Sequence, residues 1–232
     1  MSGGPADGAS TPAARRELSE EEVARAFAEP EGAMPVGSGR PETGLPRIVD
    51  VLIAATVLII LSPVLLVAAV LIRLESRGPV IFKQIRVGRY ERPFQLYKLR
   101  TMKEGSDPVV VGTVVEREDP RVTRVGRWLR RFSIDEVPNL LNVLRGEMRI
   151  VGPRPTIPSQ VALFSQRQRR RHDVRPGMTG WAQINGRVGL EWGERIELDI
   201  YYVEHRSLAL DLKILLRTTW LVVSGKGLYT GG

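Results

Sequence analysis

Cysteine is absent from this 232-residue chain, and histidine occurs only twice, as His172 and His205. The absence of cysteine excludes disulfides, thiolate metal sites and cysteine nucleophiles. Two histidines leave little room for a histidine metal site or a catalytic triad. Aromatic residues make up only 6% of the chain, which is few for the stacking platforms that bind single-stranded nucleic acid. We therefore expect no nucleic-acid partner, and any chemistry must rest on carboxylates, amides, hydroxyls and cations.

Positive charge is in excess and is unevenly distributed. The formal net charge is +8, yet residues 1–50 contain five arginines and nine acidic residues, so the remainder of the chain is strongly basic. A basic body predicts an anionic partner, such as phospholipid head groups or phosphorylated substrates. The length and the apolar content of 43% are sufficient for one core, hence for a single domain with appendages.

The first 44 residues are rich in glycine, proline, alanine, serine and glutamate. This composition predicts a disordered acidic tail over residues 1–44. A short helix over Glu17–Ala28 that docks on a partner is the alternative. The stretch is not expected to be a signal peptide, because no apolar segment follows at the usual distance.

The segment Val51–Ile72 has no charged residue and is almost wholly aliphatic. As a helix it would extend roughly 30 Å, enough to cross a bilayer core. We favour membrane insertion over a buried soluble helix, because few soluble helices are apolar on every face for so long. Pro63 removes one backbone donor and Ser62 can satisfy the freed carbonyl, so a kink is expected. Arginines flank both ends (Arg47 and Arg73), so a hairpin that returns to the same face and a kinked span both remain open.

The remainder predicts an α/β fold, mostly helical with a small sheet. Val80–Gln84 and Phe94–Lys98 are expected to form strands around a turn at Gly88–Pro93, and Val109–Val115 and Trp181–Asn185 are expected to be extended. Helices are expected over Val125–Leu129, Pro138–Leu144, Ile157–Arg171, Trp192–His205 and Asp211–Val223. The last is too short to span a membrane, so it either packs in the core or lies in the membrane interface.

Two adjacent carboxylates, Asp135 and Glu136, lie in the most basic part of the chain. One interpretation is a capping box, with Ser133 as N-cap and Glu136 three residues later. However, Pro138 removes a donor from the first turn and can leave the carboxylates free. Nearby cations keep a carboxylate ionised, as a nucleophile or a ligand of Mg²⁺ requires. The cations meant are Arg124, Arg127, Arg130, Arg131, Arg145, Arg149 and Arg154.

Further segments offer phosphate ligands. Prolines on both sides of Arg154 stiffen its backbone and can preorganise its guanidinium for a phosphate; a rigid surface turn is the alternative. The segment Arg175–Trp181 has two glycines and Thr179, which can cradle phosphate oxygens or form an ordinary turn. The candidate phosphate or substrate ligands are Lys98, Arg100, Arg154, Arg175, Thr179, Gln183 and Arg187.

Taken together, these blocks resemble the bacterial sugar transferase family, the monotopic phosphoglycosyl transferases. The matching blocks are Arg47–Asp50, Ser62-Pro63, Gly78–Gln84, Tyr97–Met102, Ser133–Glu136, Val151–Pro155 and Arg175–Arg187. Their order and spacing agree from about Arg47 to Tyr229. Lys83 and Val137 are mild departures, where arginine and leucine are usual.

The resemblance implies a re-entrant membrane helix over residues 45–77, broken at Ser62-Pro63, and a catalytic domain over residues 78–232 on the cytoplasmic face of the bacterial inner membrane. It implies that Asp135 attacks the β-phosphorus of a UDP-sugar, releases UMP and transfers the phosphosugar to undecaprenyl phosphate. Glu136 would bind Mg²⁺, and Arg154 and Arg175 would contact the diphosphate.

Two other functions remain open on the residues. One is a non-catalytic, membrane-anchored binder of anionic lipid or nucleic acid, which leaves the acids among the arginines unexplained. The other is a single-displacement transferase in which Asp135 is a metal ligand or a base. The sugar, the polysaccharide pathway and the oligomeric state, a homodimer included, are not determined by the sequence.

Overall fold

The computed structural model describes residues 43–106, 119–186 and 191–224. The predictions for residues 1–42, Val109–Val115 and Arg187 lie outside the described residues. The helices of four or more residues are α2 (Arg47–Glu75), α3 (Arg124–Arg131), η2 (Ile134–Asn139), α4 (Leu140–Arg145), α5 (Pro158–Val161), α6 (Gln166–Arg169), η3 (Arg170–Asp173), α7 (Trp181–Asn185), α8 (Trp192–His205) and α9 (Leu208–Ser224). The strands are β1 (Ile81–Val87), β2 (Pro93–Leu99), β3 (Arg149–Val151) and β4 (Gly177–Thr179), with a short turn of helix η1 (Arg89–Glu91) between β1 and β2.

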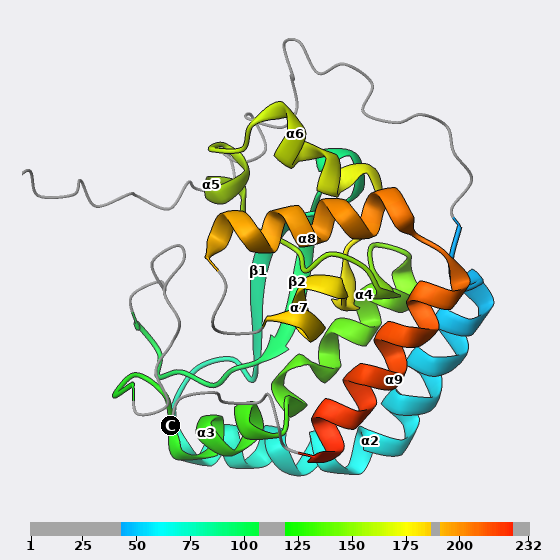
Figure 1. The fold of residues 1–232 in the computed structure, drawn as a ribbon. Coiled ribbons are helices and arrows are strands. Elements are labelled where there is room, and N and C mark those ends of the chain that lie inside the picture. The colour runs from blue at the N-terminus through cyan, green and yellow to red at the C-terminus, as the bar shows by residue number, and fades with distance from the viewer. Residues whose placement is uncertain (1–42, 107–118, 187–190, 225–232) are drawn as a thin grey trace, which may run out of the picture.

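The apolar segment forms α2, a helix of 29 residues with Pro63 inside it. Figure 1 shows its two arms running in different directions, the second along the edge of the molecule towards α3. Because Pro63 has no amide hydrogen, it leaves the carbonyl of Ile59 without its helical donor. The hydroxyl of Ser62 donates to that same carbonyl at 2.8 Å. The predicted compensation by Ser62 is therefore confirmed.

Both arms of α2 pack on the rest of the molecule. Val49, Ile53 and other residues of the first arm pack against a core that contains residues of α4, β3 and α9. Ala68 and Ile72 of the second arm are buried with Leu99 and Leu129. Outward-facing residues of α2 are exposed, among them Ile59 (73%) and Leu74 (78%).

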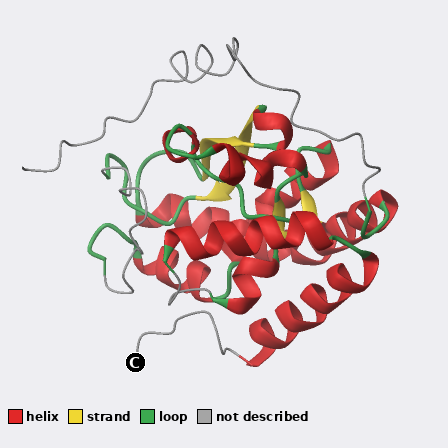
Figure 2. Ribbon diagram, turned by 45° about the horizontal axis from the view of Figure 1, so that its top comes forward, coloured by secondary structure: helices red, strands yellow, loops and turns green. Residues whose placement is uncertain are grey.

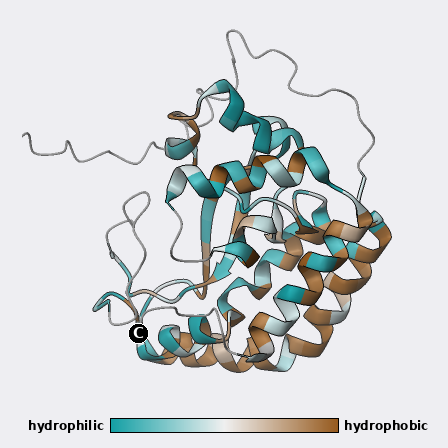
Figure 3. Cartoon of the chain, in the orientation of Figure 1, coloured by the Kyte–Doolittle hydropathy of each residue, from teal (hydrophilic) through white to brown (hydrophobic). Residues whose placement is uncertain are grey.

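By length and composition α2 is able to cross a membrane, and only 11% of its most apolar window is buried. Figure 3 shows apolar residues gathered on α2 and α9. The exposed apolar residues of α9 are Leu208, Leu212, Leu216, Trp220 and Val222. The same helix buries Ile214 completely, so α9 both packs in the core and presents an apolar face outwards.

Two small sheets lie among the helices (Figure 2). The predicted hairpin is confirmed: β1 and β2 pair antiparallel, with Ile81 opposite Leu99 and Val87 opposite Pro93. The second sheet pairs β3 with β4 in parallel, and the sequence did not predict it. It brings the segment after β3, residues 152–155, beside the segment that leads into β4.

Two predictions of secondary structure are wrong. Trp181–Asn185 is a helix, not an extended segment. Its turn is closed by the side-chain amide of Asn185, which donates to the carbonyl of Trp181 at 2.8 Å. The predicted single helix Ile157–Arg171 is divided into α5, α6 and the start of η3, because Ser165 forms a capping box that starts a new helix. The helices predicted within α3, α8 and α9 are confirmed.

Candidate active site

The two adjacent carboxylates lie on η2, a 3₁₀ helix that follows a left-handed turn at Ser133 (φ 55°). Ser133 makes no side-chain capping bond, so the capping-box interpretation is wrong. In a 3₁₀ helix successive side chains point about 120° apart. Asp135 and Glu136 therefore face different surroundings, and a non-glycine residue held at positive φ suggests that this turn is shaped for function.

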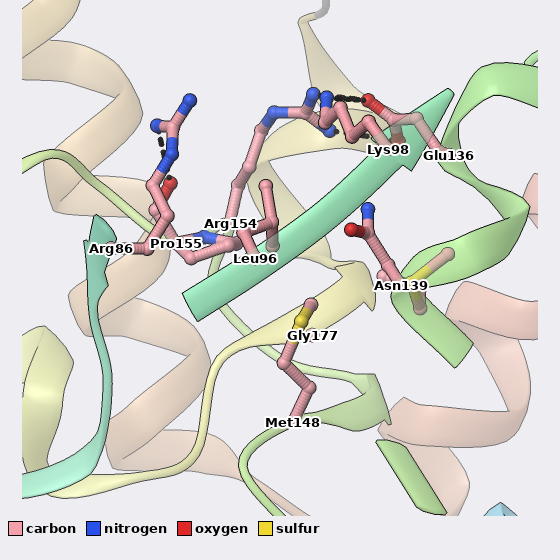
Figure 4. Close-up of a pocket in the computed structure, with 10 residues that line it drawn as sticks. Arg86, Leu96, Lys98, Glu136, Asn139, Met148, Arg154, Pro155 and Gly177 are labelled. Carbon is pink, nitrogen blue, oxygen red and sulfur yellow. Dashed lines mark hydrogen bonds and ion pairs between the residues drawn. The ribbon is translucent and has the colours of Figure 1, made fainter. Parts of the chain in front are cut away.

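Glu136 is bound by two cations. Its Oε1 accepts from Lys98 Nζ at 2.7 Å and from Arg154 Nη2 at 2.5 Å, while Oε2 lies 3.3 Å from Arg154 Nη1. Figure 4 shows the side chains of Lys98, from β2, and Arg154, from the segment after β3, meeting at Glu136. Burial alone would raise the pKa of Glu136, but Arg154 and Lys98 outweigh burial and hold that pKa well below its usual value. Glu136 is therefore an anion at neutral pH.

Asp135 is only 8% exposed. Within the part of the chain that the structure describes, its carboxylate has no hydrogen-bond or ion-pair partner. Burial, and then the negative charge of Glu136, raise the pKa of Asp135, while Lys98, Arg130 and Arg154 oppose that rise. The neighbouring acids thus differ in their contacts: Glu136 is paired with two cations, whereas Asp135 is buried without a hydrogen bond or ion pair among the described residues.

The loop that carries Arg154 is fixed by close backbone contact with the β4 segment. The amide of Gly152 donates to Thr179 O, and the amide of Gly177 donates to Pro153 O, each at 2.8 Å. A Cβ on Gly177 would lie 2.1 Å from the backbone nitrogen of Gly152, so a side chain cannot be accommodated there. The glycines of the two segments thus allow the approach that brings Arg154 to Glu136.

A pocket lies beside these groups (Figure 4). Its lining consists of Arg86, Leu96, Lys98, Glu136, Asn139, Met148, Arg154, Pro155, Gly177 and Met178. The sequence reasoning missed Arg86 and Asn139. Arg86 could have been found from the strand period, because in the observed register Arg86, Leu96 and Lys98 share one face of the hairpin.

Not all predicted ligands lie at this pocket. The buried guanidinium of Arg100 donates to the carbonyls of Ser76, at 2.8 Å, and Arg77, and so caps the end of α2. Thr179 exchanges a hydrogen bond of 2.7 Å with Thr218 of α9, and Gln183 Nε2 donates to Met178 O at 3.4 Å.

Arg175 lies in the segment before β4, where its carbonyl approaches Gly152. The structure thus brings together Asp135, Glu136, Lys98 and Arg154. The catalytic and substrate roles of all these candidates stay predictions.

The carboxylates suit a metal that is shared with a substrate. Among the described residues no group of three or more His, Cys, Asp or Glu side chains could hold a metal by itself. Mg²⁺ is commonly bound by one or two carboxylates, with substrate phosphates and waters completing its shell. Glu136 offers one such carboxylate. The donor set therefore fits Mg²⁺ held together with a diphosphate, provided that Lys98 or Arg154 moves from Glu136 to the diphosphate.

Comparison with known proteins identifies the family. The profile described as "Bacterial sugar transferase" matches residues 42–225, most of the chain. The chain belongs to the bacterial sugar transferase family, and it is an enzyme of the sugar-1-phosphate transferase class.

Three relatives illustrate the range of the family. The sugar transferase EpsL of Bacillus subtilis is 44% identical over 184 residues, 79% of this chain and 90% of that protein. A UDP-glucose:undecaprenyl-phosphate glucose-1-phosphate transferase of Caulobacter vibrioides is 49% identical over 74% of this chain and 67% of its own length. An N-acetylgalactosaminephosphotransferase of Aeromonas hydrophila is 40% identical over 78% of this chain. This chain spans only 44% of the A. hydrophila protein, so such relatives carry additional sequence.

Proposed function

We propose that this enzyme transfers a sugar 1-phosphate from a UDP-sugar to undecaprenyl phosphate and releases UMP, at the start of a bacterial surface polysaccharide or glycoconjugate. The relatives from C. vibrioides and A. hydrophila bear names of this reaction with different sugars. The observation that carries the mechanism is the contrast between the uncommitted Asp135 and the doubly paired Glu136.

In the first step an oxygen of Asp135 forms a bond to the β-phosphorus, and the bond from that phosphorus to the bridging oxygen breaks. UMP leaves with the bridging oxygen, and the phosphosugar stays on Asp135. In the second step the phosphate oxygen of undecaprenyl phosphate attacks the same phosphorus and displaces the Asp135 carboxylate. A diphosphate-linked sugar results, and the enzyme is restored.

The cations make this attack feasible. A diphosphate repels a carboxylate unless positive charge neutralises it. Lys98 and Arg154 lie where they can exchange their contact with Glu136 for the diphosphate oxygens. Glu136 would hold Mg²⁺, which when bound supplies further neutralisation of the phosphates. Once freed of its cations, the anionic Glu136 is a suitable oxygen ligand.

For the membrane, we propose a re-entrant α2 with the catalytic domain on the cytoplasmic face. A straight helix of this length would place its ends about 43 Å apart. Yet Asp50 near its start binds Arg149, and Glu75 at its end accepts from the amide of Arg124, so both ends contact the same domain. This contact favours a hairpin over a span. Such a position brings the site to the level of the acceptor phosphate, where encounters are confined to two dimensions.

The test measures UMP release by detergent-solubilised enzyme from a panel of UDP-sugars with Mg²⁺. With one sugar and without acceptor, we expect a burst of UMP equal to the enzyme present and a mass increase of one phosphosugar. Asp135→Asn should abolish both, Glu136→Gln and EDTA should suppress turnover, and the exposed Glu197→Gln should match the wild type. UMP release that always requires undecaprenyl phosphate would favour the single-displacement mechanism. No release with any donor would refute the proposed function for the sugars tested.

A further inference from the structure

The position of Arg154 depends on more than its own loop. Its side chain is 51% exposed, and its neighbours Pro153 and Pro155 have no amide to donate. The carbonyl of Arg154 accepts a hydrogen bond of 2.8 Å from Nη2 of Arg171. Arg154 binds Glu136 through its side chain, and Arg171 binds the backbone carbonyl of Arg154.

Arg171 is itself anchored by a buried carboxylate. Its Nη2 lies 2.5 Å from Oδ2 of Asp199, and the two side chains are only 3% and 5% exposed. Asp199 belongs to α8 and Arg171 to η3, and the guanidinium lies 5.8 Å from the ring centre of Phe164. One nitrogen of Arg171 thus joins the Asp199 carboxylate of α8 to the Arg154 peptide.

Thr156, which follows this loop, is held by contacts that do not involve Arg171. The amide of Val87 donates to the carbonyl of Thr156 at 2.9 Å, and the Thr156 hydroxyl lies 3.4 Å from Nε2 of His172. Other contacts also hold the backbone at Gly152 and at Pro153, and Arg86 donates to the Pro155 carbonyl at 3.2 Å. Loss of Arg171 would therefore free mainly the carbonyl of Arg154 itself.

We propose that Arg171, oriented by Asp199, is a positioning residue that fixes the peptide of Arg154 and thereby directs its guanidinium to Glu136 and the substrate diphosphate. The diphosphate part rests on the proposed function, whereas the positioning of the loop does not. Arg171 is buried behind the loop and is not proposed to touch the substrate. Since a displacement of about 1 Å at a reacting centre can cost about 10²-fold in rate, a support behind Arg154 can control turnover.

The principal variant replaces both members of the pair, Arg171→Met with Asp199→Leu. Removing one partner alone would leave a buried charge, whereas apolar replacement of both is often tolerated. Arg167→Met with Glu197→Gln is the matched control, since that pair joins α6 to the same α8 by a contact of 2.9 Å but is 58% and 52% exposed.

Two measurements are combined. Hydrogen exchange of the peptide 150–157 reports the loop through the amides of Gly152, Arg154 and Thr156, since Pro153 and Pro155 have none. We expect faster exchange in the principal variant and none of this change in the control. Turnover should fall by about 10²-fold in kcat in the principal variant. In an Arg154→Ala background the same replacement should cause almost no further loss, because Arg171 acts through Arg154.

Unchanged exchange of the loop, or losses that multiply in the Arg154→Ala background, would overturn the positioning role. If the double replacement does not fold, Arg171→Lys keeps a cation for Asp199 but shortens the reach to the Arg154 carbonyl, and it should change both readouts in the same direction. Should the wild type release no UMP with any donor, the proposed function fails, and the exchange experiment still decides whether Arg171 holds the loop.

Discussion

Replacing Asp50 by alanine should detach the first arm of α2 from the catalytic domain. Asp50 is fully buried, and its Oδ2 accepts from Arg149 Nε at 2.8 Å while Oδ1 accepts from the amide of Ile150 at 3.1 Å. Arg149 also donates to the carbonyl of Leu45 before the helix. In the Asp50→Ala variant the guanidinium of Arg149 would stay buried without its carboxylate, and the amide of Ile150 would lose its acceptor.

Breaking a buried ion pair by removing one partner costs about 3–5 kcal/mol. That is a large share of the roughly 5–15 kcal/mol that stabilises a typical domain. At about 2–4 °C per kcal/mol for a domain of this size, Tm should fall by roughly 6–20 °C. The size of the effect follows from burial, not from the number of bonds.

The assay is thermal unfolding of detergent-solubilised protein, followed by circular dichroism at one pH and one detergent concentration. Glu197→Gln is the control, because it removes an exposed ion pair worth at most about 1 kcal/mol. Limited proteolysis after residue 45 should also accelerate in Asp50→Ala. If Asp50→Ala unfolds within a degree or two of the control, the pair does not anchor α2, and the reasoning is refuted.

Two further predictions concern His172 and the bend in α2. Burial lowers the pKa of His172 below the usual 6.5, so the unfolded chain binds more protons, and stability present above pH 6.5 is lost as pH falls towards the lowered value. His172→Gln should therefore lose less Tm than the wild type between pH 7.5 and pH 5; equal losses would contradict this. Pro63→Leu with Ser62→Ala restores the amide donor to Ile59 O and should favour a straight helix. Cysteines at residues 40 and 77 should label from the same side of inverted vesicles in the wild type, and labelling of the wild type from opposite sides would refute the re-entrant arrangement.

The sequence predicted best what is local. The β1–β2 hairpin follows from two strand-like segments around a turn, and the bend at Pro63 from the lost donor. The Asp135-Glu136 pair could be identified as a candidate site because two adjacent acids lie in the most basic part of the chain. The matching family profile supports the resemblance that these blocks suggested.

What the sequence did not predict depends on contacts between distant segments. Strands β3 and β4 have three residues each, too few for a period, and they pair in parallel across 28 positions. The pair of Arg171 and Asp199 is likewise invisible until η3 and α8 are packed together.

Arg100 shows how a local reason can mislead. It follows Lys98 by two positions, so a continuing strand would place both side chains on one face. Strand β2 ends at Leu99, however, and Arg100 turns to the end of α2, where it binds backbone carbonyls. Sequence spacing alone could not distinguish a phosphate ligand from this cap.

The second arm of α2 is connected through α3 to Asp135, the proposed nucleophile, and this connection makes a separable prediction. Glu75 accepts from the amides of Arg124, at 2.7 Å, and Val125, at 2.9 Å, so it caps α3, and α3 leads into the turn before Asp135. Glu75→Ala should cost about 1 kcal/mol of stability as a lost cap. If the apolar arm sets the height of Asp135 relative to the acceptor phosphate, the UMP burst without acceptor should persist while transfer to undecaprenyl phosphate slows. A burst that falls in proportion to turnover would instead place the role of Glu75 in holding Asp135 for both steps.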